Sequence, residues 1–191
     1  MLTERDREIL TWVENYKAIS INQASILFFN NTYEGARRRL KQLEEMNHLQ
    51  HYNINDTKEK IYYYDKKLSK HDLLILDFIA TLKKYNCELL EYKYQPQYLG
   101  GKIRPDAFIV FKKDNLVYFI LLEVDLHHYT SNSKMQIYEC LYKTGELQKK
   151  CCGTFPLVII ARPTKGIRYN SNNFQVIYTG LDYNNIDRFL F

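Results

Sequence analysis

Apolar residues near the start of the chain recur at helical spacing in two successive segments. Ile9, Val13 and Tyr16 fall at i, i+4 and i+7, which is the period of one buried helix face. Ser20 then precedes Gln23 at capping-box spacing, a pattern typical of a helix N-terminus. The pattern therefore predicts a first helix, a sharp turn and a short second helix.

A third helix is predicted over residues 33–43. It follows the polar turn 30–32, which supplies two N-cap candidates of the residue types that begin helices. Within it, Ala36, Leu40 and Leu43 share one face at i, i+4 and i+7. We expect this face to pack against the two preceding helices.

The periodicity changes from helical to extended after this helix. Segments 49–54 and 60–64 are rich in Tyr and Ile, and they flank the polar turn 55–59, which is a hairpin pattern. Three short helices followed by a hairpin is the layout of a winged helix-turn-helix. We therefore predict a winged-helix DNA-binding domain over residues 1–68.

Residues 69–191 alternate helix and strand patterns, which indicates an α/β domain. The predicted helices and strands follow in the order helix 71–85, strands 88–94, 104–111 and 116–125, helix 133–150, and strands 156–161 and 174–179. The fold class expected for the whole chain is α+β, with the winged helix-turn-helix first and the α/β domain second.

The third helix carries the candidate DNA contacts. In a helix-turn-helix, the second helix of the motif enters the major groove, where Arg and Lys neutralise phosphates or read guanine edges. The formal net charge of +5 favours a polyanionic partner. An arginine-rich helix face is also compatible with a merely solvated surface, and winged helices also serve as dimerisation modules. The predicted DNA-binding residues are Tyr33, Arg37, Arg38 and Lys41 on the helix and Lys58 and Lys60 at the wing.

Three acidic residues are expected to meet in the second domain. Asp106 lies near the start of one predicted strand and Glu123 near the end of the next, so an antiparallel hairpin makes them neighbours. Glu123 and Asp125 are two residues apart and project from one face. Oxygen-rich clusters of this kind suit Mg²⁺ or Mn²⁺, with Asp106 and Glu123 as the predicted metal ligands.

These residues resemble the motif of the PD-(D/E)xK nuclease superfamily. Pro105–Asp106 matches its Pro-Asp and Glu123 its second acidic residue, but Asp125 stands where the superfamily has lysine. The resemblance implies that Lys134 replaces this lysine from the following helix, with Tyr138 one turn further on the same face. If the site is active, it implies Asp106, Glu123 and Lys134 as catalytic residues.

A structural explanation of the acids stays open beside the catalytic one. Asp106 caps a turn in this interpretation, while Glu123 and Asp125 form ion pairs with Arg104 and Lys134. Ion-pair networks perturb ionisable groups much as active sites do. Two loop histidines follow the acids, and residues in such positions are more often neither ligand nor base: His127 and His128.

The arrangement as a whole resembles the replication-relaxation family of plasmid and mobile-element proteins. The resemblance implies a DNA-binding protein that acts in replication, DNA relaxation or mobilisation and carries an inactive nuclease-like domain. The matching positions are Asp106, Glu123, Asp125, Lys134 and Tyr138.

Two other functions remain open, a magnesium-dependent DNA endonuclease and a winged-helix transcriptional regulator. The sequence has no Gly-rich phosphate loop, no signal-peptide pattern and no apolar run long enough for a bilayer. We therefore expect a cytoplasmic protein without membrane contact. The expected partners are double-stranded DNA, a second copy in a homodimer, and replication or relaxase proteins.

Overall fold

The chain divides into two compact units, Met1–Lys84 and Tyr85–Phe191. The computed structural model describes all residues except 55–58, 127 and 164–167. Its architecture is mixed α+β with two separate sheets, which confirms the predicted class at this level. In the described part of the chain, no helix has the length and apolar content needed to cross a membrane.

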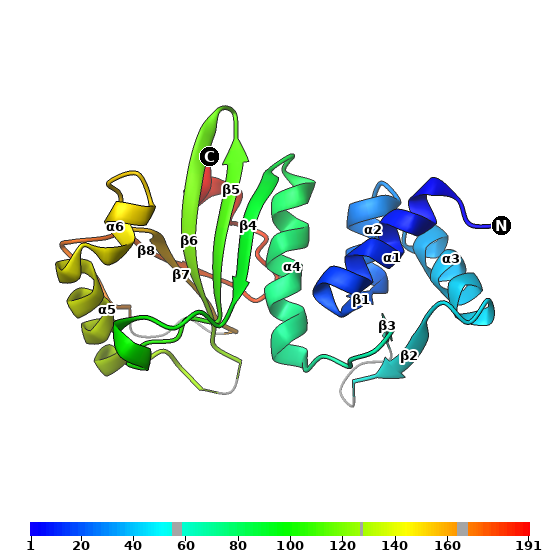
Figure 1. Cartoon of the computed structure of the whole chain (residues 1–191), viewed down its shortest axis with the longest axis horizontal. Helices are drawn as coiled ribbons and strands as arrows, with labels where there is room; N and C mark the ends of the chain where they lie inside the picture. Colours follow the sequence, from blue (N-terminus) through cyan, green and yellow to red (C-terminus); the bar gives the residue numbers. More distant parts are fainter. Residues whose placement is uncertain (55–58, 127, 164–167) are drawn as a thin grey trace. The chain divides into compact units, whose positions relative to one another are not determined.

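The first unit combines helices with a small antiparallel sheet (Figure 1). The strand order of this sheet is β1-β3-β2. The elements are α1 (Glu4–Tyr16), β1 (Ala18–Ser20), α2 (Ile21–Phe28), α3 (Tyr33–Glu45), β2 (Gln50–Asn53), β3 (Lys60–Tyr63) and α4 (Lys70–Lys84). The three predicted helices and both hairpin strands are present, whereas β1 was not predicted, since three residues are too few to show a period.

Local hydrogen bonds define where the first helices begin. Thr3 and Asp6 form a capping box at the start of α1, and Ser20 and Gln23 form the predicted one at the start of α2. Thr32 occupies the predicted N-cap position of α3, although its side chain makes no capping hydrogen bond. At the N-termini of α1 and α2, side chains accept hydrogen bonds from backbone amides, and these bonds determine where each helix begins.

Helix α4 belongs to the first unit by its packing. The buried Gln23 side chain donates hydrogen bonds to the Leu73 carbonyl (3.2 Å) and to Asp77 Oδ1 (2.8 Å), which join α2 to α4. The sequence pattern predicts a domain boundary before this helix, at 68/69. The packing of α4 places the division after Lys84 instead.

The second unit contains a five-stranded sheet in the order β4-β5-β6-β7-β8. Strands β4, β5 and β6 pair antiparallel, and β6, β7 and β8 pair parallel. The bounds are β4 (Glu88–Tyr94), β5 (Ala107–Lys113), β6 (Leu116–Val124), β7 (Leu157–Ala161) and β8 (Val176–Thr179). Strand β5 begins at Ala107 and not at the predicted residue 104, which leaves Asp106 just before the strand.

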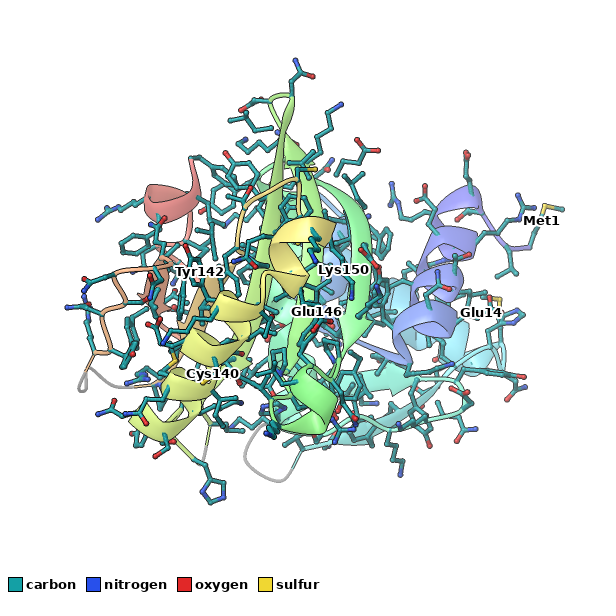
Figure 2. All side chains as sticks on the ribbon, turned by 60° about the vertical axis from the view of Figure 1, so that its left-hand side comes forward. Met1, Glu14, Cys140, Tyr142, Glu146 and Lys150 are labelled. Atoms are coloured by element: carbon teal, nitrogen blue, oxygen red, sulfur yellow. The ribbon has the colours of Figure 1, made fainter. Side chains whose placement is uncertain are left out.

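Two helices form the crossover between β6 and β7 and lie across one face of this sheet (Figure 2). They are α5 (Asn132–Thr144) and α6 (Glu146–Lys150), where a single helix over 133–150 was predicted. The prediction was wrong because Gly145 adopts φ 67°, a left-handed conformation that ends a helix. Lys150 Nζ lies 3.3 Å from Glu146 Oε1 on α6 (Figure 2).

Side chains of alternate residues on the central strands point to opposite faces of the sheet. Phe108 and Val110 of β5 belong to the same buried cluster as Tyr138 and Leu141 of α5. On β5 and β6, Phe111 stacks on Tyr118 with ring centroids 4.9 Å apart. The C-terminal α7 (Asp187–Leu190) brings the following Phe191 edge-on to both of these rings. The strands are therefore held in place by apolar contacts, and the polar residues at their ends have fixed positions.

Candidate nucleic-acid interface and carboxylate site

The exposed face of α3 carries the predicted helix contacts. Arg37, Arg38 and Lys41 are exposed, and Tyr33 exposes 42% of its surface. The opposite face is fully buried through Ala36, Leu40 and Leu43. Burial of this apolar stripe therefore orients the cationic residues of α3 toward solvent.

Acidic neighbours on α3 pair with two of these cations. Arg37 Nη2 lies 2.8 Å from Glu34 Oε2, and Lys41 Nζ lies 3.5 Å from Glu45 Oε1. All four side chains are exposed, and ion pairs of this kind contribute about 0–1 kcal/mol. A phosphate group competes easily with such partners.

Arg39 has a different role from the two arginines before it. Its guanidinium makes a two-pronged contact with the fully buried Asp6 of α1, with Nε 2.6 Å from Asp6 Oδ1 and Nη2 on Oδ2. Paired donors in this geometry form a strong, specific ion pair. Arg39 therefore joins α3 to α1.

Of the two predicted wing residues, the structure describes Lys60. Lys60 begins β3 and pairs with Asn53 of β2, and it is partly buried. Lys58 lies outside the described residues. Lys60 is thus the first described residue of the second hairpin strand, and its contact with DNA stays a prediction.

Asp106 and Glu123 lie opposite each other, as the sequence predicted. Ala107 pairs with Leu122 across β5 and β6, and the Asp106 amide donates to the Leu122 carbonyl over 3.0 Å. Asp106 Oδ2 accepts a 2.7 Å hydrogen bond from the Val124 amide. The Asp106 carboxylate thus holds the ends of the two strands together.

Two side chains from α5 contact the buried carboxylate of Glu123. Lys134 Nζ lies 2.6 Å from Oε2, and the Tyr138 hydroxyl donates to Oε1 over 2.5 Å. This pairing agrees with the prediction that Lys134 and Tyr138 share a helix face. Burial raises the pKa of Glu123 to about 7, because loss of solvent outweighs the favourable interaction with Lys134. Burial also raises the pKa of the Tyr138 phenol, and the negative charge of Glu123 raises it further.

Asp125 takes partners other than the predicted ones. Its Oδ1 accepts hydrogen bonds from the amide (2.8 Å) and hydroxyl (2.7 Å) of Thr130, and its Oδ2 lies 3.0 Å from Arg162 Nη2. The proposed partner Arg104 instead donates to the Gln95 carbonyl over 3.4 Å. Arg162 follows β7, and no feature of the sequence linked it to Asp125.

The residues do not fit a divalent metal as they stand. Both oxygens of Glu123 have partners from α5, and Asp106 Oδ2 has the Val124 amide. Within the described residues there is no group of three or more His, Cys, Asp or Glu side chains able to hold a metal ion. The expected convergence of three carboxylates was wrong, because Asp125 turns to Thr130 and Arg162. His128 is exposed, and His127 lies outside the described residues.

The first unit thus has an exposed cationic face on α3. The second unit has a buried carboxylate, Glu123, whose two oxygens both have partners. The resemblances to the PD-(D/E)xK superfamily and to the replication-relaxation family remain predictions. Comparison of the chain with known protein families, curated proteins and solved structures finds no match.

Proposed function

We propose that this protein binds double-stranded DNA through helix α3 of a winged helix-turn-helix unit. The element order α1-β1-α2-α3-β2-β3, with a β1-β3-β2 sheet, supports this assignment. In such a unit α2 and α3 are the two helices of the motif, and the hairpin of β2 and β3 is the wing. Helix α3 is then the recognition helix.

The exposed cationic face of α3 is the observation that carries the proposal. Arg37, Arg38 and Lys41 lie opposite the buried apolar stripe, and recognition helices place such a face in the major groove. Their charges have weak exposed partners or backbone contacts, so phosphates replace those partners at small cost.

The second unit acts in this proposal without hydrolysing DNA. An antiparallel hairpin followed by a parallel crossover supports a nuclease-like arrangement, with Asp106 and Glu123 at the expected strand ends. Glu123 is engaged by Lys134 and Tyr138, which leaves it unsuited to hold a metal ion. We assign Glu123 a structural role within the second unit.

The biological setting proposed is the replication, relaxation or mobilisation of a plasmid or other mobile element. This setting rests on the resemblance of the motifs around Asp106 and Glu123. It includes a homodimer on two half-sites, a cytoplasmic location, and contact with replication or relaxase proteins. Genome-wide binding maps test this setting, because occupancy of promoters and not of the element's origin would favour a transcriptional regulator.

Fluorescence anisotropy with a labelled duplex about three helical turns long tests DNA binding by the full chain. We expect Arg37→Ala, Arg38→Ala and Lys41→Ala each to weaken binding and to lower the salt slope by about one for each lost phosphate contact. Arg7→Ala, an exposed cation on α1, is the matched control. Equal affinities for all four variants and the wild type would contradict the proposal.

Hydrolysis is tested separately with supercoiled plasmid and Mg²⁺ or Mn²⁺. We expect no nicking by the wild type. Nicking that disappears in Asp106→Ala and Glu123→Gln would support the endonuclease alternative, while leaving duplex binding by α3 unaffected.

A further inference from the structure

A buried arginine in the second unit lies close to two tyrosine rings. Arg162 exposes 7% of its surface, and its guanidinium carbon lies 4.7 Å from the ring centroid of Tyr178 and 5.6 Å from that of Tyr129. Both distances are within cation–π range. Asp125, at 3.0 Å, neutralises the buried charge, so the role of Arg162 is to hold the rings and not to bind a free anion.

A second arginine extends this series. The guanidinium carbon of Arg168 lies 5.5 Å from the centroid of Tyr178, and Arg168 is exposed. The Tyr178 hydroxyl accepts a 2.7 Å hydrogen bond from the Tyr169 amide, which fixes the ring. We call Tyr129, Arg162, Tyr178 and Arg168 the aromatic–arginine ladder.

The ladder lies at the carboxyl ends of the parallel strands β6, β7 and β8. Asp125 and Arg162 directly follow β6 and β7, which are parallel, and in open α/β sheets ligands bind beyond the carboxyl ends of parallel strands. Tyr129 belongs to the connection from β6 to α5 and exposes 59% of its surface.

The two residues that follow Tyr129 make specific hydrogen bonds. Thr130 donates two hydrogen bonds to Asp125, and the Ser131 hydroxyl accepts one from the Lys134 amide as the N-cap of α5. An exposed aromatic ring next to hydrogen-bonded residues loses less conformational entropy when it is covered by a ligand than a ring on an unrestrained segment.

We propose that the aromatic–arginine ladder binds single-stranded DNA, with a base stacked on Tyr129 and Arg168 at the phosphate backbone. Single-strand sites combine aromatic platforms with cations that follow the backbone. A paired base in a duplex has both faces covered by its neighbours, so only an unpaired base reaches the Tyr129 ring. This site is separate from α3 and does not rest on the function proposed for it.

Anisotropy with labelled oligothymidylate and the full chain tests the proposal. Loss of one base–aromatic stack weakens binding by about tenfold, so we expect Tyr129→Ala to raise the Kd to this extent and Tyr129→Phe to keep the wild-type value. Tyr94→Ala, which removes another exposed tyrosine of the same unit, is the matched control and should leave the Kd unchanged.

Abasic substitution in the oligonucleotide separates stacking from a structural effect of the variant. Removing bases should weaken binding to the wild type much more than binding to Tyr129→Ala. No binding of oligothymidylate by the wild type, equal losses for Tyr129→Ala and Tyr94→Ala, or equal abasic losses for wild type and Tyr129→Ala would each overturn the proposal.

The two DNA proposals fail independently in these measurements. If Arg37→Ala weakens only duplex binding and Tyr129→Ala weakens oligothymidylate binding, both sites stand as described. If duplex binding is insensitive to Arg37→Ala while Tyr129→Ala weakens oligothymidylate binding, the α3 proposal fails and the ladder proposal stands.

Discussion

The phenol of Tyr138 donates a 2.5 Å hydrogen bond to Glu123, and both side chains are buried where α5 covers β6. Lys134 contacts the other carboxylate oxygen at 2.6 Å. One cation and one hydroxyl therefore satisfy a carboxylate that has little access to solvent. Such networks stabilise a fold only while every member keeps its partner.

The stability of the second unit should depend on the protonation of Glu123. Its folded-state pKa of about 7 lies above its ordinary value of 4.5, so between these pH values the folded state holds the proton more tightly than the unfolded state. The free energy of unfolding should therefore fall as the pH rises from 4.5 to 7, by about 1.4 kcal/mol for each unit of pKa difference. Urea unfolding of the wild type and Glu123→Gln across this range measures the effect.

Other titrating groups contribute equally to the unfolding free energies of the wild type and Glu123→Gln. Their contributions therefore cancel in the difference between these two free energies. Glu88→Gln, which removes an exposed carboxylate on β4, is the control for the loss of one glutamate charge. A constant difference between wild type and Glu123→Gln from pH 4.5 to 7 would show that Glu123 does not take up a proton on folding in this range.

Arg37 and Arg39 are two residues apart, but their substitutions should have different consequences. Arg39→Ala leaves the buried Asp6 carboxylate without its ion-pair partner, and we expect a loss of about 2 kcal/mol, below the range for fully buried pairs because Arg39 is partly exposed. Arg37→Ala removes an exposed pair and should cost less than about 1 kcal/mol. Thermal or urea unfolding distinguishes them, and equal losses would contradict the assignment.

Asp6 should also make the first unit sensitive to acid. Hydrogen bonds from Arg39 hold the pKa of Asp6 well below its usual range. The stabilisation is therefore present above about pH 4, the unfolded value, and is lost as the pH falls through the lower folded-state pKa. The difference in unfolding free energy between wild type and Asp6→Asn should shrink on acidification, and a difference that grows would refute this interpretation.

Gln23 should have a pH-dependent role through its contact with Asp77. Gln23→Ala removes hydrogen bonds to the Ser20 amide, the Leu73 carbonyl and Asp77, and we expect a loss of about 2 kcal/mol. Burial raises the pKa of Asp77 to about 6, and the Gln23 amide opposes this rise. The loss should be larger at pH 8 than at pH 5, because the charged Asp77 accepts a stronger hydrogen bond from Gln23 than the protonated form does. Equal losses at both pH values would contradict this role.

Gly145 separates α5 from α6 through its backbone conformation. Apart from its chain neighbours and the adjoining helix backbone, no atom of the described residues lies within 4 Å of a Cβ added there, so substitution meets strain and not a clash. Gly145→Ala should cost about 1 kcal/mol, and Gly145→Asn less, because Asn tolerates φ of 67° better. Urea unfolding measures both, and a larger cost for Asn would point to a steric cause instead.

Periodicity predicted the elements whose burial is one-sided. Ala36, Leu40 and Leu43 are buried as the spacing required, and the Ser20–Gln23 capping box forms as the pattern indicated. Strand β1 escaped prediction because its three residues are all buried and show no alternation. The break at Gly145 was missed because the apolar pattern continues across it.

The adjacency of Asp106 and Glu123 was predictable because a hairpin relates them through a short local turn. The pair of Asp125 and Arg162 was not, since β6 and β7 meet in parallel through a long crossover of two helices. Register between such strands depends on how α5 packs against the sheet, which no local spacing encodes.

The sequence by itself determined the helices of the first unit, the cationic face of α3 and the facing positions of Asp106 and Glu123. Each follows from steric and solvation preferences that act within one helix or one hairpin. Only the tertiary structure decided that Arg39 joins α1, that Asp125 pairs with Arg162 and that Tyr129 lies beside Arg162. These contacts join residues from separate elements, and their partners are set by the packing of the whole unit.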